Sequence, residues 1–441
     1  MSESSSAYLL ERAWVDGAVR DDVLVEIADG LITSVGLPGG NPDFPADISP
    51  EKSRFPRFTG EITRLPGLTI PGLTNDHSHA FHRALRGRTQ RGRGTFWTWR
   101  EQMYALAERL DPDTYFALAR ATYREMVAAG YTRVSEFHYL HDPEPETGDA
   151  LREAAREAGI RLTLLDACYV SSGFGAPPEG VQRRYSDGTA ERWAERVGDG
   201  PAAIHSVRAV PRDQLHVFRG RGPLHVHLSE QQAENDACLA AYGVTPTRLL
   251  HDEGLLGPDT TVVHATHLTD DDLALLGSTR TNVCITPTTE RDLADGIGPA
   301  RRLAEAGCRI SVGSDSHAVI DPFEELRGLE MDERLATWER GHWSAAELLA
   351  IGTRGASIAV GEPADLVTLD TASPRTAGTG ADENTAVFAA TAADVTHVVV
   401  DGRVVATAGD REEIGRELAA SIGASIGASI GTSIGALWPR P

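Results

Sequence analysis

The sequence predicts an α/β protein, a (β/α)8 barrel of the TIM type with a small β-sandwich domain formed by both chain termini. Eight short apolar segments alternate with helical patterns through the middle of the chain, as expected for parallel strands that are buried on both faces. Strand patterns broken by Asp-Gly turns occur near both ends, in "VLVEIADGLITSVG" and "VTHVVVDGRVVATAG".

The expected domain boundaries follow from these patterns. Residues 1–66 and 359–412 should form the two parts of the β-sandwich domain, and residues 67–358 should form the barrel. Residues 413–441 contain the repeat "ASIGASIGASIGTSIG". Glycine at every fourth position disfavours an isolated helix, so we interpret this segment as a low-complexity tail, or as a helix that needs a neighbour to pack on.

The elements of the barrel can be assigned in order. One helix should begin at Pro112, with Asp111 as its N-cap and Gly130 at its end. Residues 85–99 and 171–188 are expected to be long loops after strands, where lids and binding groups are usually found. The strand candidates are "LTIPGLTNDHSH", "YTRVSEFHYL", "IRLTLLDACYV", "AAIHSVRAV", "PLHVHLSE", "TTVVHATHL", "TNVCITP" and "CRISVGSDSH".

Composition limits the possible partners and the compartment. The 441 residues carry a formal net charge of -22, so we expect neither nucleic acid nor an anionic membrane surface as a partner. The four cysteines are scattered, which favours buried free thiols over disulfides or a thiolate zinc site. The N-terminus lacks a signal-peptide pattern and no apolar window is long enough for a membrane span, so we expect a cytoplasmic protein.

Polar side chains close several of the predicted strands. His77 and His79 alternate along one strand and therefore share a face. His227 and Asp315 end two other strands, and the carboxyl ends of barrel strands converge on the mouth where active sites lie. Three imidazoles and one carboxylate suit a single Zn²⁺, with Fe²⁺ as a substitute. Zinc lowers the pKa of a bound water to about 7, which would make the site catalytic.

Further residues near these strand ends complete the predicted site. Glu230 lies three positions after His227, within reach of a water and of a leaving nitrogen, and His264 ends the next strand. A second metal would need a bridging anion, often a modified lysine, but Lys52 is the only lysine in the sequence, so we expect one metal. We interpret the remaining histidines of these segments as supporting or structural: His225, His267 and His317.

These motifs together resemble a known family. "PGLTNDHSHAFHRAL", "HLSEQ", "VHATHL", "GSDSH" and "PADLVTLD" look like the amidohydrolase superfamily. Within it, "TFWTWREQMY" and "AGYTRVSEFHYLHD" resemble the formimidoylglutamate deiminases. The resemblance implies hydrolysis of N-formimino-L-glutamate to N-formyl-L-glutamate and ammonia, a step of histidine degradation, and a homodimer.

The resemblance also implies roles for single residues. His77, His79, His227 and Asp315 would hold zinc, and Glu230, His264 and Asp315 would act in catalysis. The glutamate portion of this small anionic substrate would be held by Arg100, Tyr139, His205 and Arg208. His82 departs from the family, which often has glutamine there, but an imidazole can still donate a hydrogen bond.

Two alternatives remain open at this point. The same barrel could deaminate a heterocycle such as guanine or act on a triazine, although such a substrate would want an aromatic, neutral pocket. A non-catalytic scaffold is an alternative of another class, although a scaffold has no need to keep every ligand and Glu230.

Overall fold

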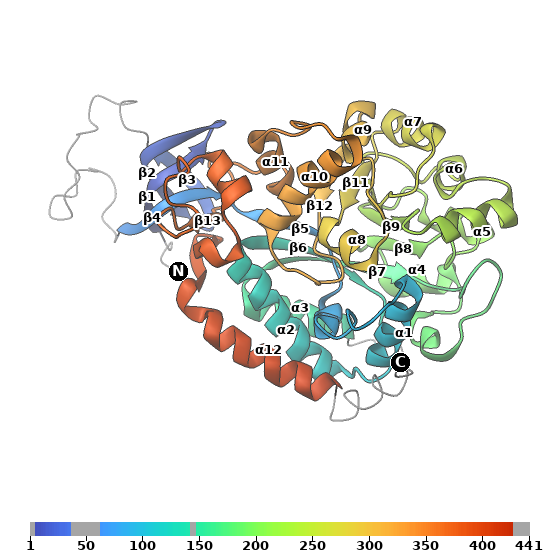
Figure 1. Ribbon diagram of the computed structural model, residues 1–441. Coiled ribbons are helices and arrows are strands. Elements are labelled where there is room, and N and C mark those ends of the chain that lie inside the picture. Colours follow the sequence, from blue (N-terminus) through green and yellow to red (C-terminus); the bar gives the residue numbers. More distant parts are fainter. Residues whose placement is uncertain (1–4, 37–61, 142–146, 427–441) are drawn as a thin grey trace.

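The computed structural model describes residues 5–36, 62–141 and 147–426. Within these residues, segments near the two ends of the chain form one mixed sheet, and the middle of the chain forms an eight-stranded parallel barrel (Figure 1). This arrangement confirms the predicted fold class.

The barrel strands follow one another in sequence order, so each strand pairs with the next. The ring closes where Ser78 bridges to Asp315, and the Asp315 N–H donates to the His77 carbonyl at 3.0 Å. Every residue of β10 and β11 is buried, as expected for parallel strands covered on both faces. The strands are β5 (Leu73–Ser78), β6 (Tyr131–His138), β7 (Arg161–Cys168), β8 (Ala202–Ser206), β9 (Leu224–Leu228), β10 (Thr260–His264), β11 (Asn282–Ile285) and β12 (Arg309–Val312).

Helices surround the barrel. The first of the long ones, α2 (Pro112–Ala129), has the predicted ends: the Asp111 carboxylate accepts from the Thr114 N–H, and Gly130 is left-handed with φ +109°. The other helices are α1 (Phe96–Ala107), α3 (Thr147–Ala158), α4 (Ala190–Val197), α5 (Gln232–Tyr242), α6 (Pro246–Asp252), α7 (Asp270–Ser278), α8 (Pro287–Leu293), α9 (Ala300–Ala306), α10 (Pro322–Thr337), α11 (Ala345–Gly352) and α12 (Arg411–Ile426).

Two segments predicted as loops contain helices. The segment 85–99 was expected to stay irregular, but α1 already begins at Phe96, because Thr95 and Thr98 cap its first turn reciprocally. The segment 171–188 contains a short 3₁₀ helix, η2 (Gly180–Tyr185). A further 3₁₀ helix, η1 (Ala80–Leu85), follows β5 directly. Both long segments therefore present ordered side chains over the barrel mouth.

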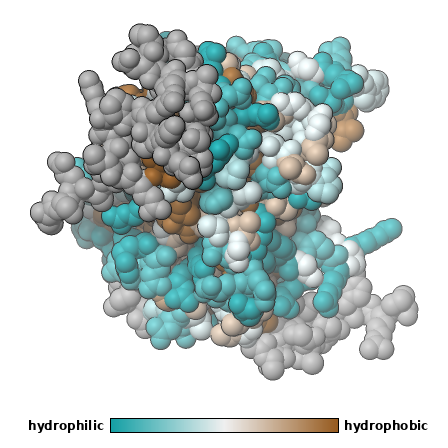
Figure 2. Space-filling model, turned by 90° about the vertical axis from the view of Figure 1, so that its left-hand side faces the viewer, coloured by the Kyte–Doolittle hydropathy of each residue, from teal (hydrophilic) through white to brown (hydrophobic). Residues whose placement is uncertain are grey.

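The smaller sheet joins the two ends of the chain. Its order is β15-β14-β13-β4-β1-β2-β3, and β4 pairs parallel with β1 and antiparallel with β13. The strands are β1 (Ser5–Val15), β2 (Ala18–Ala28), β3 (Leu31–Gly36), β4 (Ile62–Pro71), β13 (Leu366–Leu369), β14 (Val395–Val400) and β15 (Arg403–Thr407). The coloured side chains on the face of the molecule shown in Figure 2 are mostly hydrophilic, in keeping with the charge-rich composition.

The C-terminal helix α12 lies along α2 (Figure 1). Ile414 and Leu418 pack with Ala121 of α2, and Arg124 bonds to the carboxylates of Glu413 and Glu417. Tertiary packing therefore supports a helix in the first part of the glycine-rich tail. Residues 427–441 of the predicted tail lie outside the described residues. Among the described helices, none has the length and apolar character that crossing a membrane requires.

Candidate active site

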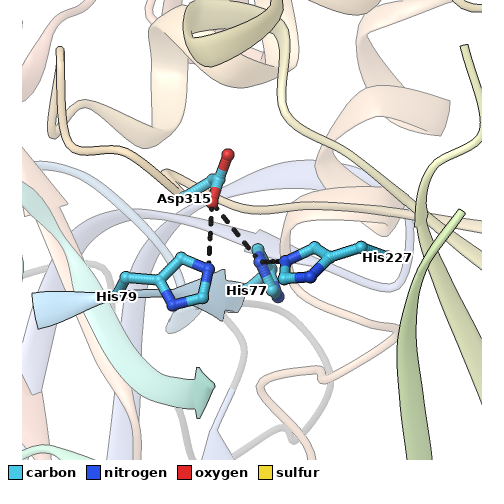
Figure 3. A group of neighbouring side chains, drawn as sticks. All are labelled: His77, His79, His227 and Asp315. Atoms are coloured by element: carbon cyan, nitrogen blue, oxygen red, sulfur yellow. Dashed lines mark hydrogen bonds and ion pairs between the residues drawn. The ribbon is translucent and has the colours of Figure 1, made fainter. Parts of the chain in front are cut away.

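Four side chains from distant parts of the sequence meet at the mouth of the barrel (Figure 3). The His77 and His227 Nε2 atoms are 3.0 Å apart, and Asp315 Oδ1 lies 3.4 Å from Nε2 of both His77 and His79. All four ligand atoms lie within 4.8 Å of one another. Two nitrogens about 2.0–2.1 Å from a tetrahedral ion would be roughly 3.3 Å apart, so the spacing fits a zinc-sized ion.

The backbone brings these groups together. Asp315 can approach β5 because Gly313 has no side chain, and a Cβ added there would lie 2.6 Å from the His77 carbonyl oxygen. Asp315 and His264 both have left-handed backbones, with φ +39° and +71°. Such conformations are rare in residues other than glycine and concentrate at functional sites.

The imidazoles present their Nε2 atoms to the centre. Nδ1 of His79 is 2.9 Å from the Phe137 carbonyl, and Nδ1 of His227 is 2.9 Å from the His205 carbonyl, so each Nδ1–H donates outward. Burial lowers the pKa of His79 and His227 well below the usual value, which keeps the rings neutral. The pKa of Asp315 is also lowered: burial would raise it, but the hydrogen bond from His77 and the nearby positive charge of His264 outweigh that effect. Neutral imidazoles and an ionised carboxylate are the forms that bind a divalent cation.

His264 lies beside the four candidate metal ligands and is surrounded by the carboxyl groups of Glu230, Glu290 and Asp315. Its Nε2 is 3.7 Å from Glu230 Oε1 and 4.0 Å from Asp315 Oδ2, and its Nδ1 is 3.1 Å from the Thr286 hydroxyl. Burial would lower the pKa of His264, but the charge of Glu230 and a hydrogen bond to Glu290 raise it to about 10. A protonated ring here can donate to a group bound between Glu230 and Asp315.

A pocket opens above these residues, and the other predicted site residues line it: His82, Arg100, Tyr139, His205 and Arg208. Glu230, His264 and Asp315 lie at the same pocket, whereas His77 is buried beneath it. Nε2 of His82 is 3.1 Å from the Tyr139 hydroxyl, and its Nδ1 has no hydrogen-bond partner in the described chain. Burial lowers the pKa of His82 to about 3, so this ring is a neutral hydrogen-bonding group.

The pocket contains two guanidinium groups. Arg208 faces the buried Glu234 carboxylate at 3.8 Å. Arg100 lies over the Trp97 and Tyr104 rings, 4.5 and 5.4 Å from their centroids, and forms no ion pair within the described residues. Burial, and then the charges of Arg208 and Arg100, lower the pKa of His205 well below its usual value. Both cations are therefore close to His205, with donors left for an anionic ligand.

Sequence reasoning missed the residues that hold the pocket rim. The Gln182 side-chain amide in η2 donates to the hydroxyls of Tyr104 at 3.1 Å and Tyr169 at 3.0 Å, and thereby joins η2 to α1 and to the segment after β7. Tyr185 packs against Tyr139 and Tyr169. Only the position of 171–188 after a barrel strand indicated a role near the mouth.

A second cluster of possible metal ligands lies between β6 and β7, formed by His138, His141 and Asp166. The Asp166 carboxylate already accepts two hydrogen bonds from the Arg196 guanidinium, at 2.7 and 2.8 Å, and one from the Trp193 indole at 3.0 Å. Its lone pairs are in use and a cation lies beside it, so we assign no metal to this cluster.

Comparisons with known proteins agree with this geometry. A profile of the amidohydrolase family matches residues 68–405. The formimidoylglutamate deiminase of Pseudomonas aeruginosa is 34% identical over an alignment that covers 94% of this chain and 97% of that protein. A 5-methylthioadenosine/S-adenosylhomocysteine deaminase of Syntrophobacter fumaroxidans is 29% identical, with 77% and 80% covered. The crystal structure of an amidohydrolase from Brucella melitensis superimposes with a TM-score of 0.82 at 29% identity, covering 96% of this chain and all of that one.

Proposed function

This chain belongs to the amidohydrolase family, and from that premise we propose that it hydrolyses N-formimino-L-glutamate to N-formyl-L-glutamate and ammonia, with one zinc ion at the four-residue centre. The observation that carries the proposal is the pair of cations, Arg100 and Arg208, in a pocket next to that centre. The similarity to the Pseudomonas aeruginosa enzyme, whose name states this activity, supports it.

The proposed metal ligands are His77, His79, His227 and Asp315. Zinc held there lowers the pKa of water and so supplies a nucleophile at neutral pH. Fe²⁺ could take its place with the same donor set.

The substrate offers two kinds of group to the pocket. Its two carboxylates suit guanidinium forks, so Arg208 binds one and Arg100, at the more open rim, binds the other. His205, which is neutral, and the Tyr139 hydroxyl add hydrogen bonds. The formimino carbon, bonded to two nitrogens, then faces the centre and the carboxyl groups of Glu230 and Asp315.

Asp315 and Glu230, which lie on either side of His264, transfer the protons in the proposed reaction. Water adds to the formimino carbon, and its proton passes to Asp315, whose Oδ2 is turned toward His264. Glu230, whose pKa is raised by burial, supplies one proton to the terminal nitrogen as water adds. The proton held by Asp315 then moves to the same nitrogen while Glu230 takes the proton of the new hydroxyl group. The carbon–nitrogen bond breaks, ammonia leaves, the N-formyl product remains, and both carboxyl groups return to their starting forms. His264 donates a hydrogen bond to the reacting group and stabilises the charge that develops on it.

The decisive experiment is an assay of ammonia release by purified, zinc-loaded protein. N-formimino-L-glutamate should be hydrolysed, whereas guanine, 5′-deoxyadenosine and an aminotriazine should not. A preference for a heterocycle would replace this proposal with the alternative deaminase. Glu230→Gln protein is the matched control, and a substrate turned over equally by both proteins would contradict the proposed site. A non-catalytic scaffold would release no ammonia from any of them.

A further inference from the structure

Strand β6 brings consecutive residues of the "SEFHY" segment to His79. The Glu136 carboxylate accepts from the Ser78 hydroxyl at 2.5 Å and from the Ala80 N–H at 2.6 Å. The carbonyl oxygen of the next residue, Phe137, accepts a hydrogen bond from the Nδ1–H of His79 at 2.9 Å. His79 is therefore held through its own ring and through both of its chain neighbours.

Glu136 is an unusual residue for this position. It is fully buried, and it forms no ion pair in the part of the chain that the structure describes. Burial raises the pKa of Glu136, and the hydrogen bonds from the Ser78 hydroxyl and the Ala80 N–H oppose that rise because they favour the ionised form. A buried carboxylate without a cation costs stability, and here the hydrogen bonds from Ser78 and Ala80 offset part of that cost.

The hydrogen bonds around Glu136 continue to the other side of the centre. The Ser78 oxygen is 3.1 Å from Nε2 of His317. Because the Ser78 proton is donated to Glu136, His317 must donate its Nε2–H to Ser78. His317 is two residues after Asp315, so the chain of hydrogen bonds joins the segment with His77 and His79 to the segment with Asp315.

We propose that Glu136 is the positioning residue of the metal centre: its carboxylate fixes β5 and η1 on either side of His79 and, through Ser78 and His317, fixes the loop that carries Asp315. The inference rests on the proposed metal-binding role of these ligands. Groups that orient metal ligands typically contribute a factor of about 10–100 to metal affinity.

Replacing Glu136 by glutamine should disrupt this arrangement. The amide oxygen can still accept from Ala80 N–H, but the amide NH₂ then faces Ser78 and must donate to it. Ser78 would donate to His317 in turn, and the His317 proton would move to Nδ1. That atom is buried and has no partner among the described residues, so a buried donor is left unsatisfied.

The test measures zinc affinity directly, by competition with a chromogenic chelator, and the increase in Tm when zinc is added. Glu136→Gln should weaken zinc binding about 10–100-fold and reduce the zinc-dependent increase in Tm. Unchanged zinc affinity in a folded Glu136→Gln protein would overturn the proposal.

Glu325→Gln is a matched control, because Glu325 is equally buried and also accepts from one hydroxyl and one backbone N–H, both of Thr288, away from the four ligands. It should lower the Tm of the metal-free protein but leave zinc affinity unchanged, and an equal loss of affinity would reduce the effect at Glu136 to general destabilisation. If Glu136→Gln does not fold, Ser78→Ala tests the same chain of hydrogen bonds by removing a single hydroxyl, and an unchanged zinc affinity there would also overturn the proposal. If the unsubstituted protein binds no zinc, the metal proposal itself fails, and that result is distinct from equal binding by both proteins.

Discussion

Replacing Arg208 by glutamine tests whether the pocket recognises an anion. The side chain of Arg208 is 20% exposed, so its hydrogen bonds to a bound carboxylate are largely shielded from water. Hydrogen bonds to charged groups contribute about 1.5–3 kcal/mol each. A loss of about 2.7 kcal/mol corresponds to about a 100-fold lower kcat/KM, at about 1.36 kcal/mol per factor of ten.

The loss should fall mainly on KM, because the carboxylate is remote from the carbon that reacts and is held alike in the ground and transition states. Arg100 lies on the more open side, over Trp97, which is 40% exposed. Arg100→Gln should therefore lower kcat/KM by a smaller factor, about 10-fold. Steady-state kinetics of ammonia release from N-formimino-L-glutamate measure both values.

Glu234 supplies the internal control for this prediction. Arg208→Gln removes the cation nearest to its buried carboxylate and should also destabilise the protein. The double variant Arg208→Gln/Glu234→Gln should regain that stability but not the lost kcat/KM. Arg212→Gln is the matched surface control, since Arg212 bonds to Glu253 and does not line the pocket. Activity that returns with stability in the double variant would refute a binding role for Arg208.

Four further predictions test other parts of the argument. Removing metal with a chelator should abolish ammonia release and added zinc should restore it; activity that survives complete removal, checked by elemental analysis, would exclude the proposed centre. Glu230→Gln should lower kcat by about 10²–10⁴-fold while KM changes little, as steady-state kinetics would show, because a proton donor is lost and a binding group is not. Burial raises the pKa of Glu234 from 4.5 to about 7. The contribution of Glu234 to stability is therefore complete below about pH 4.5 and is lost as the pH rises through about 7. In urea unfolding, the stability of Glu234→Gln should decrease less between about pH 5 and about pH 8 than that of the unsubstituted protein. Leu418→Ala should cost about 2–3 kcal/mol in urea unfolding, because Leu418 is buried against α2, and kcat should stay unchanged; an unchanged midpoint would mean that α12 is not packed as described.

The sequence was sufficient to predict the barrel and the four residues at its mouth. Alternation along a strand places His77 and His79 on one face, and the ends of parallel strands converge, so His227 and Asp315 could be added without coordinates. The residues around them could not be found in this way. Glu136 reaches Ser78 over 58 positions, and Ser78 reaches His317 over 239, and no periodicity links such residues.

Local sequence propensity gave the wrong expectation for two helices, α12 and the first turn of α1. The glycines of the tail disfavour a helix, yet α12 forms as far as Ile426 because α2 provides an apolar surface and a cation for it. The start of α1 at Phe96 was missed because its cap pairs Thr95 with Thr98 instead of a Glu or Gln. In both cases, contacts made by particular side chains determine where the helix forms, and the residue types alone did not indicate this.

The place of β4 in the smaller sheet has a consequence for biosynthesis. This strand lies between β1, from the start of the chain, and β13, which begins about three hundred residues later at Leu366. On the ribosome, the first strands emerge while their partners on the far side of β4 have yet to be translated, and one edge of β4 stays open during that time. The smaller sheet can therefore be completed only after β13 has been translated, and premature termination before Leu366 would leave the open edge of β4 exposed to aggregation.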